Sequence, residues 1–381
     1  MEEWKEYKLG DVCSRLKSGK GISSSSILEN AQYPVIGGNG IRGYVNTANF
    51  KGECAVIGRQ GAYCGNVRYF NGEAYMTEHA VVAVGNSNVN TRYLACLLAR
   101  MQLGNLSAQS AQPGLSVQIL SKLLVKLPPL YLQNKIAAVV KSIDDKIELN
   151  RRINDNLEQQ AQALFKSWFV DFEPWGGKMP DDWRKGNLGD VIIEVESGSR
   201  PKGGAEILGI PSIGAEKIES FGAYNYSGEK YVSVDFYSKM KRGHVKDGDV
   251  MLYKDGAYTG KCSMALDGFP YENCAVNEHV FLLRTRKSKY QLYLYLTMTQ
   301  AYIRSMIHTL ACAKAAQPGL NTSELLGVET IVPTEDIMAK FNSLVFDMMH
   351  AIANNAIENH RLAQLRDTLL PKLMSGELKI S

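Results

Sequence analysis

The stretch WKEYKLGDV at residues 4–12 returns as WRKGNLGDV at residues 183–191, an offset of 179. Three later signatures return in the same order: GAYCG from Gly61 as GAYTG from Gly256, Glu78-His79 as Glu278-His279, and AQPGLS from Ala111 as AQPGLN from Ala316. The offset only grows, to 205 in the last signature, so the second copy carries 26 additional residues between shared landmarks. A duplication of this length is too long for a solenoid repeat and predicts two similar halves related by a pseudo-two-fold.

Composition is that of a soluble globular chain. Its 381 residues, of which 45% are hydrophobic and 22% charged, suffice for two or three domains with separate cores. No apolar run reaches the roughly 18 residues of a membrane span, and the N-terminal stretch lacks the pattern of a secretory signal, so we expect a cytoplasmic protein with no membrane partner. The seven cysteines form no CxxC pair, which predicts reduced thiols and neither disulfides nor a metal site.

The net charge of +4 is unevenly distributed. Residues 1–130 carry 13 Lys and Arg against 8 Asp and Glu, whereas residues 180–332 carry 18 against 18. This balance permits a nucleic-acid partner without requiring one.

Each half divides into a part rich in glycine and tyrosine and a long helical part. Residues 1–130 and 180–332 contain short β-branched and aromatic runs, which predict short strands joined by tight turns. We also expect one helix at residues 91–103 and one near residues 290–310. Both parts are therefore predicted to be mixed α/β units.

A heptad pattern predicts two long helices. The first seam steps by four and three over 33 residues, at Ile136, Val140, Ile143, Ile147, Asn150, Asn154, Leu157, Ala161, Leu164 and Trp168. Adding 205 gives the second seam, at Phe341, Val345, Met348, Ile352, Asn355, Asn359, Leu362, Arg366, Leu369 and Leu373. Both seams contain two asparagines, which fix register because a buried amide needs a polar partner.

Antiparallel pairing about the centres of the two asparagine pairs would place Asn150 opposite Asn359 and Asn154 opposite Asn355. The alternative is that each helix packs only on its own globular part and that the asparagines are exposed. A 33-residue helix is about 50 Å long. Antiparallel pairing would hold two globular parts at opposite ends of a spacer that covers roughly 15 base pairs of B-DNA.

The chain resembles the specificity subunits of type I restriction-modification systems. The resemblance covers essentially the whole sequence and rests on the LGDV opening of each half, PPL-x-x-Q-x-x-I from Pro128, ALFKSWFVDFEP from Ala163, P-x-x-W from Pro180, and LLPKLMSGEL from Leu369. It implies two similar mixed α/β target-recognition domains separated by two long antiparallel helices. The implied boundaries are 1–130 and 173–332 for the recognition domains, and 131–172 and 333–381 for the spacer helices with the C-terminal tail.

The resemblance also implies partners. Each recognition domain would bind one half of a split double-stranded DNA site. Two methyltransferase subunits would bring S-adenosylmethionine and methylate adenine, and restriction subunits would bring ATP and magnesium. The specificity subunit itself would carry no catalytic residue, cofactor or metal. Two departures are the second spacer, whose IVPTEDIMAKF from Ile331 lacks the counterpart of Gln133, and Arg366, which interrupts the second seam.

The sequence matches known catalytic motifs poorly. GAYTGKC from Gly256 has three residues between its glycines where a phosphate-binding P-loop needs four, and Cys262 stands in place of Ser or Thr. The two Glu-His pairs each precede an apolar run, so a structural hydrogen bond is favoured over acid-base chemistry. Two other functions stay open: an enzyme that uses the Gly256 loop, and a protein scaffold that does not bind DNA.

Loops that combine glycine, a cation and a planar side chain are the candidate DNA contacts, because glycine admits phosphates and Arg, Gln and Asn read base edges. The candidates are Arg42, Arg59, Gln60, Tyr63, Arg68, Gln109 and Gln112 in the first half, and Arg200, Lys202, Lys254, Tyr258, Lys261, Lys314 and Gln317 in the second. Two domains that read different half-sites should differ where they read. Base readout is therefore expected at Arg59-Gln60 against Lys254-Asp255, and at residues 66–68 against 261–263.

Aromatic residues crowd the tail of the first long helix, at Phe165, Trp168, Phe169, Phe172 and Trp175. One interpretation is that they close the core between helix and recognition domain. The other is that they dock a methyltransferase subunit, and the sequence does not divide the residues between these roles.

Overall fold

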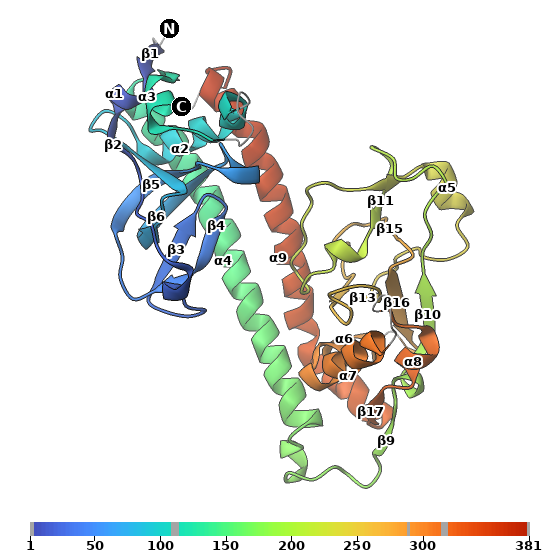
Figure 1. The fold of residues 1–381 in the computed structure, drawn as a ribbon. Helices are drawn as coiled ribbons and strands as arrows, with labels where there is room; N and C mark the ends of the chain where they lie inside the picture. Colours follow the sequence, from blue (N-terminus) through green and yellow to red (C-terminus); the bar gives the residue numbers. More distant parts are fainter. Residues whose placement is uncertain (1–3, 108–113, 288–289, 314–318, 379–381) are drawn as a thin grey trace. The chain divides into compact units, whose positions relative to one another are not determined.

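The computed structural model describes residues 4–107, 114–287, 290–313 and 319–378. The chain divides into two compact units, Met1–Asp144 with Gln364–Ser381, and Asp145–Ala363. Each unit holds one copy of the duplicated signatures and part of each long helix, α4 (Leu130–Phe169) and α9 (Glu335–Ser375) (Figure 1). The predicted fold class, two mixed α/β domains joined by a pair of long helices, is confirmed. In the described parts of the chain, no helix combines the length and apolarity that crossing a membrane requires.

The first unit is built on a six-stranded sheet in the order β2-β7-β5-β6-β3-β4. Its neighbours run antiparallel except β3 and β6, which run parallel. The strands are β2 (Cys13–Ser18), β3 (Tyr33–Gly37), β4 (Gly40–Val45), β5 (Phe50–Gly58), β6 (Val67–Met76) and β7 (Ala80–Gly85), with β1 (Lys5–Lys8) and β8 (Leu124–Leu127) in a separate ladder. The helices are α1 (Leu9–Val12), α2 (Thr91–Arg100) and α3 (Val117–Lys122).

Gln133 explains the sequence motif at the start of α4. Its side chain is 2% exposed. Its Oε1 accepts a hydrogen bond from Asn90 N at 3.0 Å, and its Nε2 donates to Pro128 O at 2.9 Å. Asn90 in turn caps α2, because its side chain accepts from Tyr93 N. One buried amide thus fixes both the start of α2 and the start of α4.

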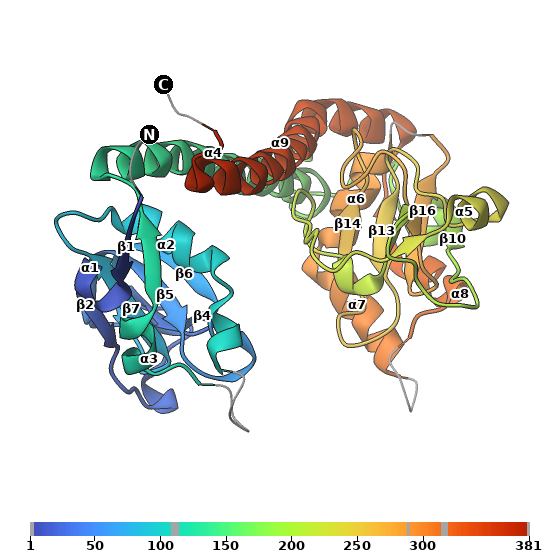
Figure 2. The same ribbon diagram turned by 90° about the horizontal axis from the view of Figure 1, so that it is seen from above.

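The second unit repeats this plan with two smaller sheets, in the orders β10-β16-β13-β14 and β12-β11-β15. The strands are β10 (Ile192–Ser197), β11 (Ile210–Ile213), β12 (Tyr231–Val232), β13 (Val250–Tyr253), β14 (Cys262–Met264), β15 (Ala275–Val276) and β16 (Val280–Thr285), while β9 (Arg184–Asn187) and β17 (Glu329–Val332) form a ladder that repeats β1 and β8. The shorter helices are α5 (Val234–Lys239), α6 (Gln291–Thr299), α7 (Ala301–Cys312) and α8 (Thr322–Leu326). Helix α6 lies against β13 and β14 (Figure 2).

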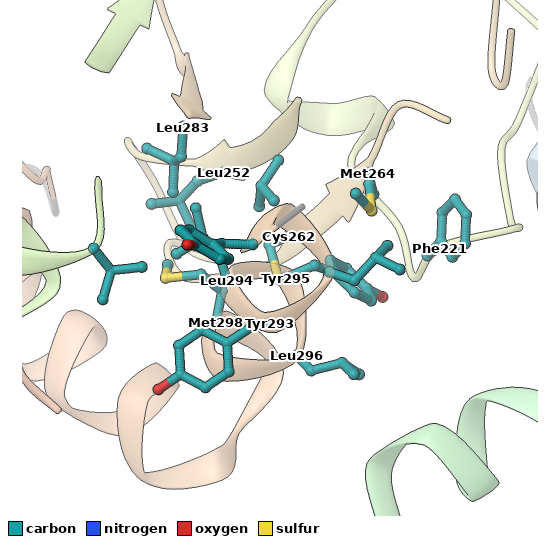
Figure 3. Close-up of a cluster of buried hydrophobic side chains, with 14 of the residues drawn as sticks. Phe221, Leu252, Cys262, Met264, Leu283, Tyr293, Leu294, Tyr295, Leu296 and Met298 are labelled. Carbon is teal, nitrogen blue, oxygen red and sulfur yellow. The ribbon is translucent and has the colours of Figure 1, made fainter. Parts of the chain in front are cut away.

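The core of the second unit surrounds α6, whose residues from Gln291 to Met298 are all buried. In Figure 3, Tyr295 lies beside Cys262 and extends toward Phe221, and the rings of Tyr295 and Phe221 are 5.7 Å apart. A helix that is apolar on every side must be enclosed. The single helix predicted near residues 290–310 is in fact two helices. The chain leaves α6 at Gln300, whose backbone is extended. Helix α7 then packs against α6 and helps to enclose it. The helix predicted at residues 91–103 ends earlier, at Arg100.

The predicted asparagine pairing is confirmed within the second unit. Asn150 Nδ2 donates to Asn359 Oδ1 at 3.0 Å, and Asn355 Nδ2 donates to Asn154 Oδ1 at 2.9 Å. Asn150 is fully buried and Asn154 is 8% exposed, so the interpretation with exposed asparagines is wrong. The two helices run antiparallel here in the register that the sequence predicts.

The ends of the seams differ from the heptad prediction. In the tail of α4, Phe165 and Phe169 are buried, while Leu164 and Trp168 are only half-buried. The buried stripe has rotated by one position because the tail packs on a domain core as well as on α9. Arg366, the charged interruption of the second seam, donates from Nη1 to Asp144 Oδ1 at 2.9 Å within the first unit.

Candidate nucleic-acid interface

Three of the duplicated signatures meet at one edge of the first unit. Arg59 N, at the end of β5, donates to His79 O at 2.9 Å, and Leu115 N donates to Arg59 O at 2.9 Å. Gln60 forms an isolated antiparallel bridge with Gly114. Segments up to 56 residues apart in the sequence are therefore tied together by backbone hydrogen bonds around the Gly-Ala-Tyr turn.

The second unit repeats these contacts position by position. Lys254 N donates to His279 O at 3.1 Å, and Leu320 N donates to Lys254 O at 3.0 Å. Asp255 forms the bridge with Gly319 that Gln60 forms with Gly114 in the first unit. The duplicated motifs thus specify a loop frame, and the side chains mounted on it differ between the copies.

A glycine lies seven residues after each LGDV motif, at Gly19 and at Gly198, and it packs against the same frame in both units. A Cβ on Gly19 would lie 2.1 Å from Met76 O, and one on Gly198 would lie 1.5 Å from Val276 O. No side chain fits at either place. These two glycines therefore mark a close approach of two backbones beside the start of the strand that follows each Glu-His pair.

In the first unit, the frame borders an open hollow of about 320 Å³. Three of the predicted residues, Arg42, Gln60 and Tyr63, line it together with His79 and the hairpin turn between β3 and β4. Tyr63 is 51% exposed. A cation, an amide and an aromatic ring around a polar hollow can donate to phosphate and base-edge acceptors.

Arg68 differs from the other predicted cations of this unit. Its Nη1 donates to Asn39 O at 2.7 Å and its Nη2 to Asn39 Oδ1 at 3.4 Å. The guanidinium lies close over Gly40, where a Cβ would meet Nη1 at 2.2 Å. In this conformation Arg68 supports the hairpin turn beside the hollow. Its partner there is Asn39, which the sequence did not indicate as part of the site. A turn signal, Gly-Gly-Asn-Gly, was the only feature in the sequence that could have revealed it.

The second unit places its predicted cations beside carboxylates. Arg200 Nε lies 3.2 Å from Glu278 Oε1, Lys254 Nζ lies 3.5 Å from Asp255 Oδ2, and Lys261 Nζ lies 3.6 Å from the Glu219 carboxylate.

One of these lysines also contacts an aromatic ring of the predicted set. Lys261 also sits over the ring of Tyr258, which is 61% exposed, at 4.5 Å from the centroid. Lys202 is exposed, on the loop before β11. Gln109, Gln112, Lys314 and Gln317 lie outside the described residues.

The Glu-His pairs agree with the structural interpretation. His79 Nε2 lies 3.1 Å from Glu78 Oε1, and His279 lies 3.4 Å from Glu278 Oε1 and 3.1 Å from Asp255 Oδ2. Within residues 4–107, 114–287, 290–313 and 319–378, no three His, Cys, Asp or Glu side chains gather as a metal site would require. Burial raises the pKa of the Cys262 thiol to about 12. This thiol therefore stays protonated at neutral pH.

The aromatic tail of α4 belongs mainly to a core. Phe169 packs on Tyr293, Phe341 and Trp183, with ring centroids 4.9 to 5.5 Å apart. Trp168 and Trp175 pack on each other at 5.5 Å. The interpretation that these residues close the core between helix and recognition domain is therefore correct for the buried rings.

The chain is similar to known proteins in both sequence and structure. A family described as type I restriction modification DNA specificity domain matches residues 1–159. The type I restriction enzyme HindI specificity subunit of Haemophilus influenzae is 25% identical over 468 aligned residues, which cover 99% of this chain and 100% of the relative. The crystal structure of a type I restriction-modification S subunit from M. genitalium matches with a TM-score of 0.65 at 15% identity, over 100% of this chain and 97% of that one.

The chain is thus similar to type I restriction enzyme specificity subunits, and the match to their DNA specificity domain covers residues 1–159. The EcoprrI specificity subunit of Escherichia coli is 40% identical over 146 residues, which cover 37% of this chain and 36% of the relative. The MjaIX subunit of Methanocaldococcus jannaschii is 28% identical, over 73% of this chain and 66% of the relative. The chain thus spans about a third and about two thirds of these two relatives, and all of the HindI subunit.

The two loop frames carry different side chains at matched positions. Arg59 stands where Lys254 stands, Gln60 where Asp255 stands, and Arg68 where Ser263 stands. Gly21 stands where Arg200 stands, at the offset of the first signature.

Proposed function

We propose that this chain selects the DNA site of a type I restriction-modification complex. The first recognition domain, residues 1–130, reads one half of a split double-stranded site, and the second, residues 173–332, reads the other. The spacer helices, residues 131–172 and 333–381, set the unread gap. The chain contributes no catalytic residue, and methylation and cleavage take place on partner subunits.

One observation carries this proposal: the same backbone frame occurs twice with different side chains at the matched positions. A scaffold for two copies of one partner would need equal surfaces, whereas two half-sites of different sequence need unequal ones. At one matched position the frame holds Gln60, whose amide both donates and accepts, and Asp255, whose carboxylate only accepts. Glutamine can pair with adenine through two hydrogen bonds, and aspartate can accept from the cytosine amino group.

Partners follow from the proposed role. We propose two methyltransferase subunits, which bring S-adenosylmethionine, and restriction subunits, which bring ATP and magnesium, with the whole complex acting in the cytoplasm. A surface for the methyltransferase remains available on the outward faces of the long helices. Leu149 and Ile153 of α4 are 51% and 39% exposed, one helical turn apart.

The decisive experiment maps methylated adenine across the genome of a host that expresses this chain with a methyltransferase subunit of its own system. The expected result is a two-part motif with a fixed gap, present only when both proteins are expressed. Methyltransferase alone is the first control.

A matched pair of variants tests which domain reads which half. Gln60→Ala should relax the motif in one half and Asp255→Ala in the other, because these residues occupy the same place in the two frames. Both proteins soluble and in complex but without new methylation would refute the proposal and favour a protein scaffold. Relaxation of the same half by both variants would refute the assignment of one reader to each half.

A further inference from the structure

We infer that the two recognition domains contribute unequally to DNA binding: the first supplies most of the salt-dependent attachment to phosphates, and the second carries cations that are already neutralised by its own carboxylates. This inference rests on the proposed function. It concerns how binding energy is divided between two sites that the duplication makes equivalent in backbone.

The matched positions show the difference most directly. Arg59 and Lys254 occupy the same position in the two frames, and their backbones donate and accept the same hydrogen bonds. Lys254 has Asp255 beside it at 3.5 Å, whereas Arg59 has the neutral Gln60 at that position. Among the residues that the structure describes, Arg59 forms no ion pair, and residues 108–113, which lie outside the described part, contain no ionisable side chain.

The same contrast extends to the other candidate cations. Arg42 is exposed at the hollow and has no carboxylate partner in the described part of the chain, and Arg68 bonds only to the neutral Asn39. In the second unit, Arg200 and Lys261 pair with Glu278 and Glu219. Lys202 is the described candidate in that unit without an ion pair among the described residues.

Counterion release explains why this matters. A free cation that contacts a phosphate displaces a condensed ion from DNA, and each contact steepens the dependence of log K on log salt by about 0.9. Over a fourfold change in salt, one contact is worth roughly a 3.5-fold change in affinity. A lysine that already has a carboxylate at 3.5 Å brings no net charge to the phosphate, and the carboxylate repels it. The second unit should therefore add little to the salt slope.

Isosteric changes at the matched position test the inference in the full-length chain. Gln60→Glu adds a carboxylate beside Arg59, and Asp255→Asn removes the one beside Lys254. The probe is a fluorescein-labelled 30-base-pair duplex of arbitrary sequence, with affinity measured by anisotropy between 50 and 200 mM KCl. We expect Gln60→Glu to flatten the slope by about 0.9 and Asp255→Asn to steepen it by a similar amount.

Charge removal gives the independent arm. Arg59→Gln should flatten the slope by about 0.9, and Lys254→Gln by less than half as much. Lys51→Gln, on the far end of β5 and paired with Glu73, is the control and should leave the slope unchanged. Equal flattening by Arg59→Gln and Lys254→Gln, or an unchanged slope in Asp255→Asn, would overturn the inference while leaving DNA binding intact. A wild-type chain that does not bind the duplex even at 50 mM KCl would instead overturn the proposed function itself.

Discussion

Replacing Asn154 with alanine should destabilise the second unit by about 2 kcal/mol. Asn154 Nδ2 donates to Ile352 O at 3.1 Å, and Asn154 Oδ1 accepts from Asn355 Nδ2 at 2.9 Å. Each bond contributes about 1 kcal/mol net, and alanine offsets a few tenths of a kcal/mol through its higher helix propensity. Because Asn154 is only 8% exposed, water does not replace the lost partners.

A double-mutant cycle isolates the contact between the helices. Asn355→Ala removes the same hydrogen bond and leaves Asn154 Oδ1 without a donor, which should also cost about 2 kcal/mol. Since one bond is lost in both single variants, the double variant should cost about 1 kcal/mol less than their sum. Replacing both residues with leucine should be close to neutral, because no buried polar group is then left without a partner.

Urea unfolding followed by tryptophan emission measures these differences. Trp168, Trp175 and Trp183 lie in the second unit, and a Trp4→Phe background restricts the signal to them. With a slope of about 2 kcal/mol per M urea, each single variant should lower the midpoint by about 1 M. Asn354→Ala, at an exposed position next to Asn355, is the control and should stay within about 0.5 kcal/mol of the parent. A coupling energy below about 0.5 kcal/mol would refute the argument that the asparagine pair fixes the helix register.

Two further predictions concern the second unit. Gly198→Ala should cost at least about 3 kcal/mol or prevent this unit from folding, because the new Cβ would lie 1.5 Å from Val276 O. Gly203→Ala is the control, because no atom lies within 4 Å of the added Cβ, and it should have less than a fifth of that effect. Thermal unfolding followed by circular dichroism compares the two variants. Equal melting temperatures would contradict the close-approach argument. The pKa of Glu358 lies below its usual 4.5, first because Asn150 donates a hydrogen bond to the carboxylate and then because Lys146 lies beside it. The stability that this carboxylate adds is therefore complete above pH 4.5 and is lost as pH falls through the lowered pKa. Glu358→Gln should therefore lose less stability than the parent between pH 5 and pH 3 in urea titrations, and parallel losses would show that the carboxylate adds nothing.

The duplication and the helix register could be deduced from the sequence because both are periodic. A heptad seam places residues on one helical face whatever surrounds it, and a buried asparagine accepts only a polar partner. Those two facts predict that Asn150 lies opposite Asn359, and the structure confirms it. The ion pair between Arg366 and Asp144 could not be deduced, because the heptad pattern places Arg366 within the second seam without indicating which charge on the other helix faces it.

The candidate interface was predicted in part. The motifs identified Arg42, Gln60 and Tyr63, which the structure gathers at one hollow. They also suggested Arg68 as a base reader, although its guanidinium supports the Asn39 turn. Charge counts do not separate exposed from buried cations: Arg284, for example, is buried against Asp249 at 2.6 Å.

The sequence by itself determined that there are two copies, that two long helices carry matched seams, and in which register those helices meet. These properties depend on residues a few positions apart, or on offsets that stay constant along the chain. Only the tertiary structure decided that three of the duplicated signatures meet at one loop frame in each unit, and which of the cations there face a carboxylate. Such contacts join segments up to about 80 residues apart through loops without periodicity, where partners are chosen by the path of the backbone and not by spacing.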